Sequence, residues 1–136
     1  MTVGIRVGSI ADEIGAPSFL HAFFSTVSAY CDTSEWGSRF PNLFKLYEGH
    51  LPSRLAPLAV VELRAAREEA LSKLPPSQVV WDIEDRSAMP PWGTDIAPTI
   101  TSLGNYFVSS TGRDLFELLE EALQAAASES ADAFIE

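Results

Sequence analysis

Thiols and long apolar runs are scarce in this 136-residue sequence. Cys31 is the one cysteine, so the chain can form neither an internal disulfide nor a metal site built from several thiols. No hydrophobic run reaches the roughly 18 residues that a membrane span needs. The first residues also lack the basic start and apolar stretch of a signal peptide. These absences predict a cytoplasmic protein.

Basic residues are also few. Nine Lys and Arg stand against nineteen Asp and Glu, which gives a formal net charge of −10. Residues 1–77 contain seven basic and eight acidic residues, whereas residues 78–136 contain two basic and eleven acidic ones. A negative field repels nucleic acid and anionic membranes and attracts basic proteins. We therefore expect neither nucleic acid nor a membrane as partner. The charge fits a basic protein partner, or it serves solubility alone.

The sequence motifs of known catalytic sites are missing as well. There is no P-loop and no dinucleotide fingerprint, and His50 has no cysteine or second histidine at zinc-ligand spacing. His21, Ser25 and Asp32 are the residue types of a hydrolase triad, but no nucleophile elbow accompanies them. We interpret His21 as a surface or half-buried histidine. The sequence thus predicts no cofactor, no metal ligand and no catalytic residue.

Regular patterns of apolar residues predict the fold. Alternation of apolar and polar residues predicts strands at 2–10, 78–85, 105–109 and, at an edge, 133–136. Apolar stripes at helical spacing predict helices that begin at Pro17 and near Asp114, with others at 42–48 and about 58–74. Together these elements predict an α+β fold. It is one domain, residues 1–136, with a mixed or antiparallel sheet of about four strands packed against three main helices.

The long helix at 58–74 has a predicted inner and outer face. Leu58, Val61 and Leu63 are among the apolar residues assigned to packing, whereas Glu62 is assigned to the exposed face.

The predicted outer face of segment 78–85 is acidic. Val79, Trp81 and Ile83 are predicted to point inward, which leaves a cluster of Asp82, Glu84 and Asp85 at the surface. Closely spaced carboxylates can hold a divalent metal, so a metal-dependent hydrolase is one interpretation. Neighbouring Arg86 is a poor base, and the negative field would repel a phosphodiester. A solvated strand face and a patch that binds a basic partner are the other interpretations.

The three tryptophans are predicted to play different parts. Trp81 is assigned to the core. Trp36 and Trp92 each precede a glycine in a loop, where a tryptophan either packs the loop down or serves as a contact for a partner. The sequence leaves both possibilities open for these two residues.

Several short motifs, in this order along the chain, resemble one protein family. They are Val3–Ile10, Ser18–His21, Glu35–Pro41, Val80–Asp85, Pro90–Gly93, Asn105–Val108 and Asp114–Phe116. The family is the immunity-protein family numbered seventy of the bacterial polymorphic toxin systems, and the resemblance extends from Thr2 to Glu136. It implies a small intracellular α+β protein that binds the effector domain of a toxin and protects the cell that makes it. It assigns no functional residues.

We therefore hypothesise an immunity protein that inhibits a cognate toxin domain, itself basic, by binding rather than catalysis. The residues predicted to contact the partner are Trp36, Arg39, Asp82, Glu84, Asp85, Trp92 and Asp95. The alternative is a metal-dependent hydrolase that uses Asp82, Glu84 and Asp85. A third interpretation is an oligomeric cytosolic protein whose acidity serves only solubility, and a homo-oligomer is compatible with either non-enzymatic interpretation.

Overall fold

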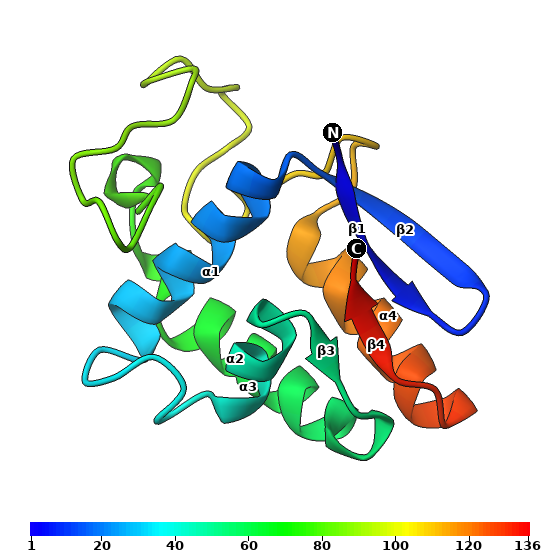
Figure 1. Cartoon of the computed structure of the whole chain (residues 1–136). Coiled ribbons are helices and arrows are strands. Elements are labelled where there is room, and N and C mark those ends of the chain that lie inside the picture. The colour runs from blue at the N-terminus through cyan, green and yellow to red at the C-terminus, as the bar shows by residue number, and fades with distance from the viewer.

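The computed structural model describes all residues from Met1 to Glu136. Four strands form one sheet: β1 (Val3–Val7), β2 (Ile10–Gly15), β3 (His50–Leu51) and β4 (Ala133–Ile135). Their order is β2-β1-β4-β3, and every neighbouring pair is antiparallel. The α-helices are α1 (Pro17–Cys31), α2 (Pro41–Tyr47), α3 (Ala56–Glu69) and α4 (Leu115–Glu129). The predicted α+β class is confirmed, and the sheet is antiparallel (Figure 1).

The first strand is half of a hairpin that the sequence pattern did not reveal. The predicted strand 2–10 ends at Val7, and the chain reverses at Gly8 and Ser9 into β2. Gly8 has a φ of +60°, a backbone conformation that suits a two-residue hairpin turn. β2 escaped the prediction because most of it is exposed, and only its end at Ile14 and Gly15 is buried.

The last strand lies inside the sheet, not at its edge as predicted. β4 pairs with β1 on one side and with β3 on the other. Phe134 lies opposite both Arg6 and His50, and its ring is covered by the Arg6 guanidinium and stacked on His50. The two termini therefore lie close together at one end of the sheet (Figure 1).

Helices α1 and α4 supply much of the core. Phe23 of α1 meets Phe107 and Phe116 edge to face, with ring centroids 5.2 and 5.1 Å apart. α4 begins where the sequence predicted, because the Asp114 carboxylate accepts the Glu117 amide and caps the helix. No helix of the chain is both long enough and apolar enough to cross a bilayer.

The predicted strand at 78–85 does not exist. Residues 76–78 form a 3₁₀ turn, and the chain then runs along α1 without a strand partner. The Thr26 hydroxyl accepts the Val80 amide at 3.1 Å, and its proton has two acceptors in reach, the carbonyls of Ala22 at 2.9 Å and Val80 at 3.1 Å. The Ile83 amide donates to Ser25 Oγ at 3.0 Å. Side-chain hydroxyls of α1 therefore form hydrogen bonds with the backbone of this segment, in place of the backbone hydrogen bonds of a sheet. Val80 is the buried residue of the segment, whereas Val79 and Trp81, predicted to point inward, are only partly buried against the core.

The predicted strand at 105–109 is also absent. Its one ladder contact is an isolated bridge between Val108 and Asp114. The segment turns back directly into α4, so it has no room to pair along its length.

Helix α3 differs from the prediction in length and in one buried charge. It ends at Glu69 and is followed by a 3₁₀ turn at Leu71–Lys73. Leu58 and Val61, which were predicted to pack inward, are 53% and 63% exposed. Glu62, which was predicted to face water, is buried. The contact with helix α2 explains why Glu62 is buried. The first turn of α2 has no capping side chain of its own, and the Glu62 carboxylate accepts the amides of Asn42 and Leu43 at 3.1 and 3.0 Å.

Candidate functional site: the acidic loop

Residues 79–106, which we call the acidic loop, belong to the longest stretch without helix or strand, residues 79–114. In Figure 1 the loop is drawn in green to yellow on the far side of α1 from the hairpin β1–β2. Its carboxylates are Asp82, Glu84, Asp85 and Asp95, and Arg86 is its one basic residue.

Side-chain hydrogen bonds fix the first turns of the loop. Asp82 Oδ1 accepts the Glu84 amide at 2.9 Å, and Asp85 Oδ1 accepts the Ser87 amide at 3.1 Å. Asp and Asn side chains that bond to the backbone two residues further on are a standard way to hold a turn. The acidic residues therefore shape the loop as well as charge it.

Two tryptophans and a tyrosine hold the second half of the loop. The Trp92 indole N–H donates to the Tyr106 hydroxyl at 2.9 Å, and the Trp92 ring meets Trp81 edge to face at 5.3 Å. Tyr106 is buried, and burial raises the pKa of its hydroxyl above the ordinary value. Trp81, predicted to be core, is partly buried and packs against the core. Trp92 remains 41% exposed, so part of the side chain is anchored on Trp81 and Tyr106 and part is accessible to solvent.

An apolar pocket opens beside Trp92. Its volume is about 310 Å³, and its walls include Val79, Met89, Ile96 and Tyr106. Met89 is 65% exposed at its rim. Concave, mostly apolar sites of roughly this size are typical places for a side chain or small ligand to bind.

His21 and Tyr47, neither of them predicted as site residues, tie the loop to the helices. The His21 Nε2 atom lies 2.9 Å from Asp82 Oδ1, and the Tyr47 hydroxyl lies 3.4 Å from His21 Nδ1. The hydrogen bond from His21, with that from the Glu84 amide, holds the pKa of Asp82 below its ordinary value. Burial raises the pKa of Tyr47, and the charges of Glu84 and Asp82 raise it further. No local sequence pattern signals a contact between residues 61 positions apart.

Trp36 belongs to the aromatic cluster that continues from Tyr47. Its ring is half-buried and meets Phe44 edge to face at 5.5 Å and Tyr47 at 5.9 Å. Through Tyr47 and His21 it is connected to Asp82, so two predicted contact residues from distant parts of the sequence are linked by packed rings.

Arg39 lies in the same loop as Trp36 but is engaged within the chain. It forms an ion pair with Glu69 and donates to the carbonyl of Cys31 at 3.2 Å. This loop, residues 32–40, is separate from the acidic loop and is held by Asp32. The Asp32 carboxylate accepts hydrogen bonds from the amides of Gly37, Arg39 and Phe40 and from the Ser38 hydroxyl. Burial alone would raise the pKa of Asp32, but these hydrogen bonds hold it below its ordinary value.

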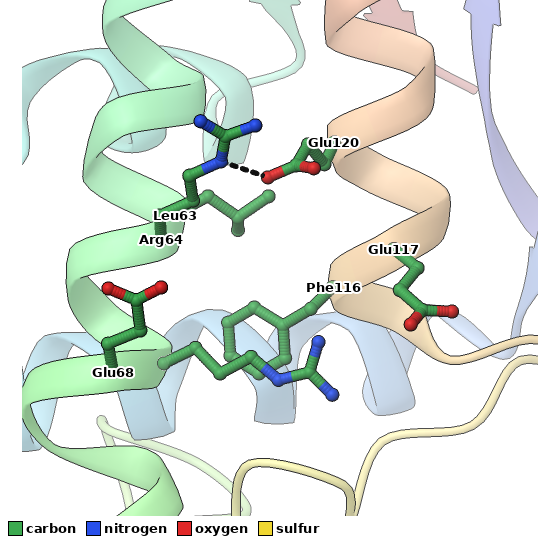
Figure 2. Close-up of a pocket in the computed structure, with 7 residues that line it drawn as sticks. Leu63, Arg64, Glu68, Phe116, Glu117 and Glu120 are labelled. Atoms are coloured by element: carbon green, nitrogen blue, oxygen red, sulfur yellow. Dashed lines mark hydrogen bonds and ion pairs between the residues drawn. The ribbon is translucent and has the colours of Figure 1, made fainter.

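The arginines are distributed so that the negative charge of the loop stays unbalanced. Four of the eleven carboxylates of residues 78–136 pair with arginines: Glu120 with Arg64 (Figure 2), Asp114 with Arg67, Glu136 with Arg6 and Glu121 with Arg113. Figure 2 shows the Arg64–Glu120 pair beside a pocket between α3 and α4. The volume of this pocket is about 230 Å³. By contrast, Glu84, Asp85 and Asp95 are exposed and form no ion pair. With Arg86 included, the acidic loop has a formal net charge of −3, while Glu117 and Glu129 of α4 are further exposed carboxylates without an ion pair.

The residues proposed for catalysis are not assembled for it. Nowhere does the structure bring three His, Cys, Asp or Glu side chains into a group that could hold a metal ion. Asp82 is turned toward His21, and the Asp85 carboxylate accepts the Ser87 hydroxyl at 2.6 Å. No hydrogen bond joins His21, Ser25 and Asp32: Ser25 accepts the Ile83 amide, and Asp32 accepts amides of residues 37–40.

Comparison with protein families decides the relationship that the motifs suggested. The family described as Immunity protein 70 matches residues 5–135. The chain belongs to this family. The Immunity protein 70 match includes the acidic loop, α1 and the whole sheet apart from the first residues of β1. No curated protein and no solved structure matches the chain.

Proposed function

We propose that this Immunity protein 70 member binds the effector domain of a cognate toxin and neutralises it without catalysis. The observation that carries the proposal is the family match, which covers residues 5–135. A family of immunity proteins implies a toxin as partner. On this proposal residues 1–136 act as one binding domain in the cytoplasm of the cell that makes the toxin.

The acidic loop is the surface that we propose for the contact. Glu84, Asp85 and Asp95 have no cationic partner within the chain, so their field is available to a basic toxin domain. Charges arranged in this way steer encounter and raise the association rate more than they raise affinity.

Trp92 is the anchor we propose within this surface. It is exposed enough to be covered by a partner, and its bond to Tyr106 holds it in place beforehand. Residues that dominate protein interfaces are enriched in tryptophan, and a side chain already held in place loses less conformational freedom on binding. The adjacent apolar pocket offers space for a side chain of the toxin. Trp36 and Arg39, engaged within the chain, contribute less to this surface.

Inhibition by binding is favoured over chemistry by what the polar groups of the site do. Asp82, Asp85 and Ser25 are acceptors in hydrogen bonds that hold the loop. A general base or nucleophile must instead be directed at a substrate.

Growth protection tests the proposal. The toxin domain encoded beside this gene is expressed in bacterial cells with the wild-type protein, with a loop variant (Glu84→Gln, Asp85→Asn, Asp95→Asn) or with a control variant (Glu68→Gln, Glu117→Gln, Glu129→Gln). The control removes the same charge from exposed carboxylates outside the loop. We expect the wild type and the control to restore growth and the loop variant to protect less. Cells that die despite soluble wild-type protein would contradict the proposed function.

A further inference from the structure

A second concave surface adjoins the acidic loop, and neither the sequence motifs nor the family match assigns it a role. We call it the His21 groove. It is an open groove of about 440 Å³ between the first half of α1, the end of α2 and the adjoining ends of β1 and β4. The residues that shape it are Val3, Leu20, His21, Phe24, Tyr47 and Ile135.

The groove is apolar along its floor and polar at one end. Leu20 and Phe24 are buried, and the Phe24 ring meets Tyr47 edge to face at 5.5 Å. His21 and Tyr47 are the polar side chains of the lining, and both are half-buried. A side chain that fits this shape has an apolar stem and a polar head.

The polar end is also the anionic end. Asp82 lies 2.9 Å from His21, and the other ring nitrogen of His21 lies 3.4 Å from the Tyr47 hydroxyl, so one carboxylate adjoins the polar end. Glu84 is exposed and unpaired. A lysine or arginine side chain matches this arrangement, because its methylene stem lies well on apolar surface while its charged head reaches a carboxylate or an aromatic face.

We propose that the His21 groove receives a basic side chain of the toxin, with its stem on Leu20 and Phe24 and its cationic head beside Tyr47 and Asp82. The inference rests on the proposed function and extends the contact surface from the acidic loop onto α1 and α2. The acidic loop draws the basic domain in, and the groove holds one of its side chains.

Blocking the groove tests the inference. Val3→Arg places a cation of the chain itself in the groove, and Thr2→Arg adds the same charge one residue away, where the side chain does not line the groove. The probe is the toxin domain encoded beside this gene, inactivated by mutation, and binding is measured by calorimetry. We expect Val3→Arg to weaken binding at least about tenfold, the loss of about 1.4 kcal/mol, and Thr2→Arg to bind like the wild type. Equal binding by wild type and both variants would overturn the groove while leaving the proposed function intact. No binding by the wild type would refute the proposed function itself.

Nuclear magnetic resonance of the wild type provides a measurement that does not depend on whether Val3→Arg folds. The chain has two histidines, His21 in the groove and His50 on the outer face of the sheet. We expect the imidazole signals of His21 to shift in the toxin complex and those of His50 to stay unchanged. An unchanged His21 signal in a saturated complex would overturn the inference.

Discussion

The His21 imidazole lies 2.9 Å from the Asp82 carboxylate, and this contact joins helix α1 to the acidic loop. One turn further along α1, Ser25 accepts the Ile83 amide. The residue types that suggested a hydrolase triad thus hold a loop in place. The loop has no strand or helix of its own, and its conformation depends on such contacts.

Removing the imidazole should loosen the start of the loop without unfolding the protein. In His21→Ala, we expect faster amide hydrogen exchange in residues 79–85 and unchanged exchange in α4. The pKa of Asp82 should also rise toward its ordinary value, because the bond from His21 is the main cause of its lowering. Since this pKa is depressed in the folded state, the pair stabilises the fold above the ordinary carboxyl pKa, and the stabilisation is lost as pH falls through the lowered value.

A second histidine–carboxylate pair is the control for this titration. His50 lies 2.8 Å from Asp132 and lowers the pKa of that carboxyl. In His50→Ala the pKa of Asp132 should rise while that of Asp82 stays where it is in the wild type. A His21→Ala protein in which the pKa of Asp82 does not move would show that the pair is absent in solution.

Thr26 should contribute to stability, because its hydroxyl binds the backbone of Val80 where a neighbouring strand would otherwise do so. Thr26→Val keeps the shape of the side chain but removes the hydroxyl that accepts the buried Val80 amide. We expect the free energy of unfolding in urea to fall by about 1–3 kcal/mol. Thr26→Ser retains the hydroxyl and should lose less. Equal stability of the valine variant and the wild type would mean that the Val80 backbone finds another partner.

Asp32 should make the protein sensitive to acid. Its pKa is lowered in the folded state, so its contribution to stability is present above the ordinary carboxyl pKa and is lost as pH falls through the lowered value. Asp32→Asn should lower the free energy of unfolding at neutral pH by about 1–3 kcal/mol and flatten the acid side of the stability curve. Asp95→Asn, at an exposed position, is the control and should leave the curve unchanged. An acid side that is equally steep in wild type and Asp32→Asn would contradict the prediction.

Among the carboxylates of α3, Glu62 should contribute most to the free energy of unfolding. Glu62→Ala removes the acceptor for two buried amides and for the Asn42 side chain, and we expect a loss of about 2–3 kcal/mol in the free energy of unfolding. Glu68→Ala, at an exposed position of the same helix, should change it by less than about 0.5 kcal/mol. Burial raises the pKa of Glu62, so the wild type should gain stability relative to Glu62→Gln as pH falls through that raised pKa. Similar losses at both positions would show that Glu62 does not cap α2.

Local signals predicted the parts of the fold that depend on local physics. Pro17 and Asp114 mark helix starts because proline suits a first turn and a carboxylate accepts its free amides. The α+β class was predicted correctly, and the antiparallel sheet is one of the two types, mixed or antiparallel, that the sequence left open. The two-residue strand β3 has no pattern to detect, and β2 is too exposed to show one.

The errors arose where distant residues decide the outcome. The apolar residues of segment 78–85 alternate as in a strand, but its amides donate to the hydroxyls of Ser25 and Thr26 instead of to a neighbouring strand. Glu62 looks like a surface residue until the uncapped start of α2 is brought against it. For the site, the sequence indicated the acidic residues and Trp92 but not His21 or Tyr47, because their roles depend on contacts across the fold.

The rate of association with the toxin domain, measured by stopped flow over a range of salt concentrations, tests the central claim most directly. We predict that the wild type and the control variant (Glu68→Gln, Glu117→Gln, Glu129→Gln) associate at rates that fall steeply with salt. The loop variant (Glu84→Gln, Asp85→Asn, Asp95→Asn) should associate at least about tenfold more slowly at low salt, with a weaker dependence on salt. Equal rates for all three proteins at every salt concentration would contradict the claim that the acidic loop meets the toxin.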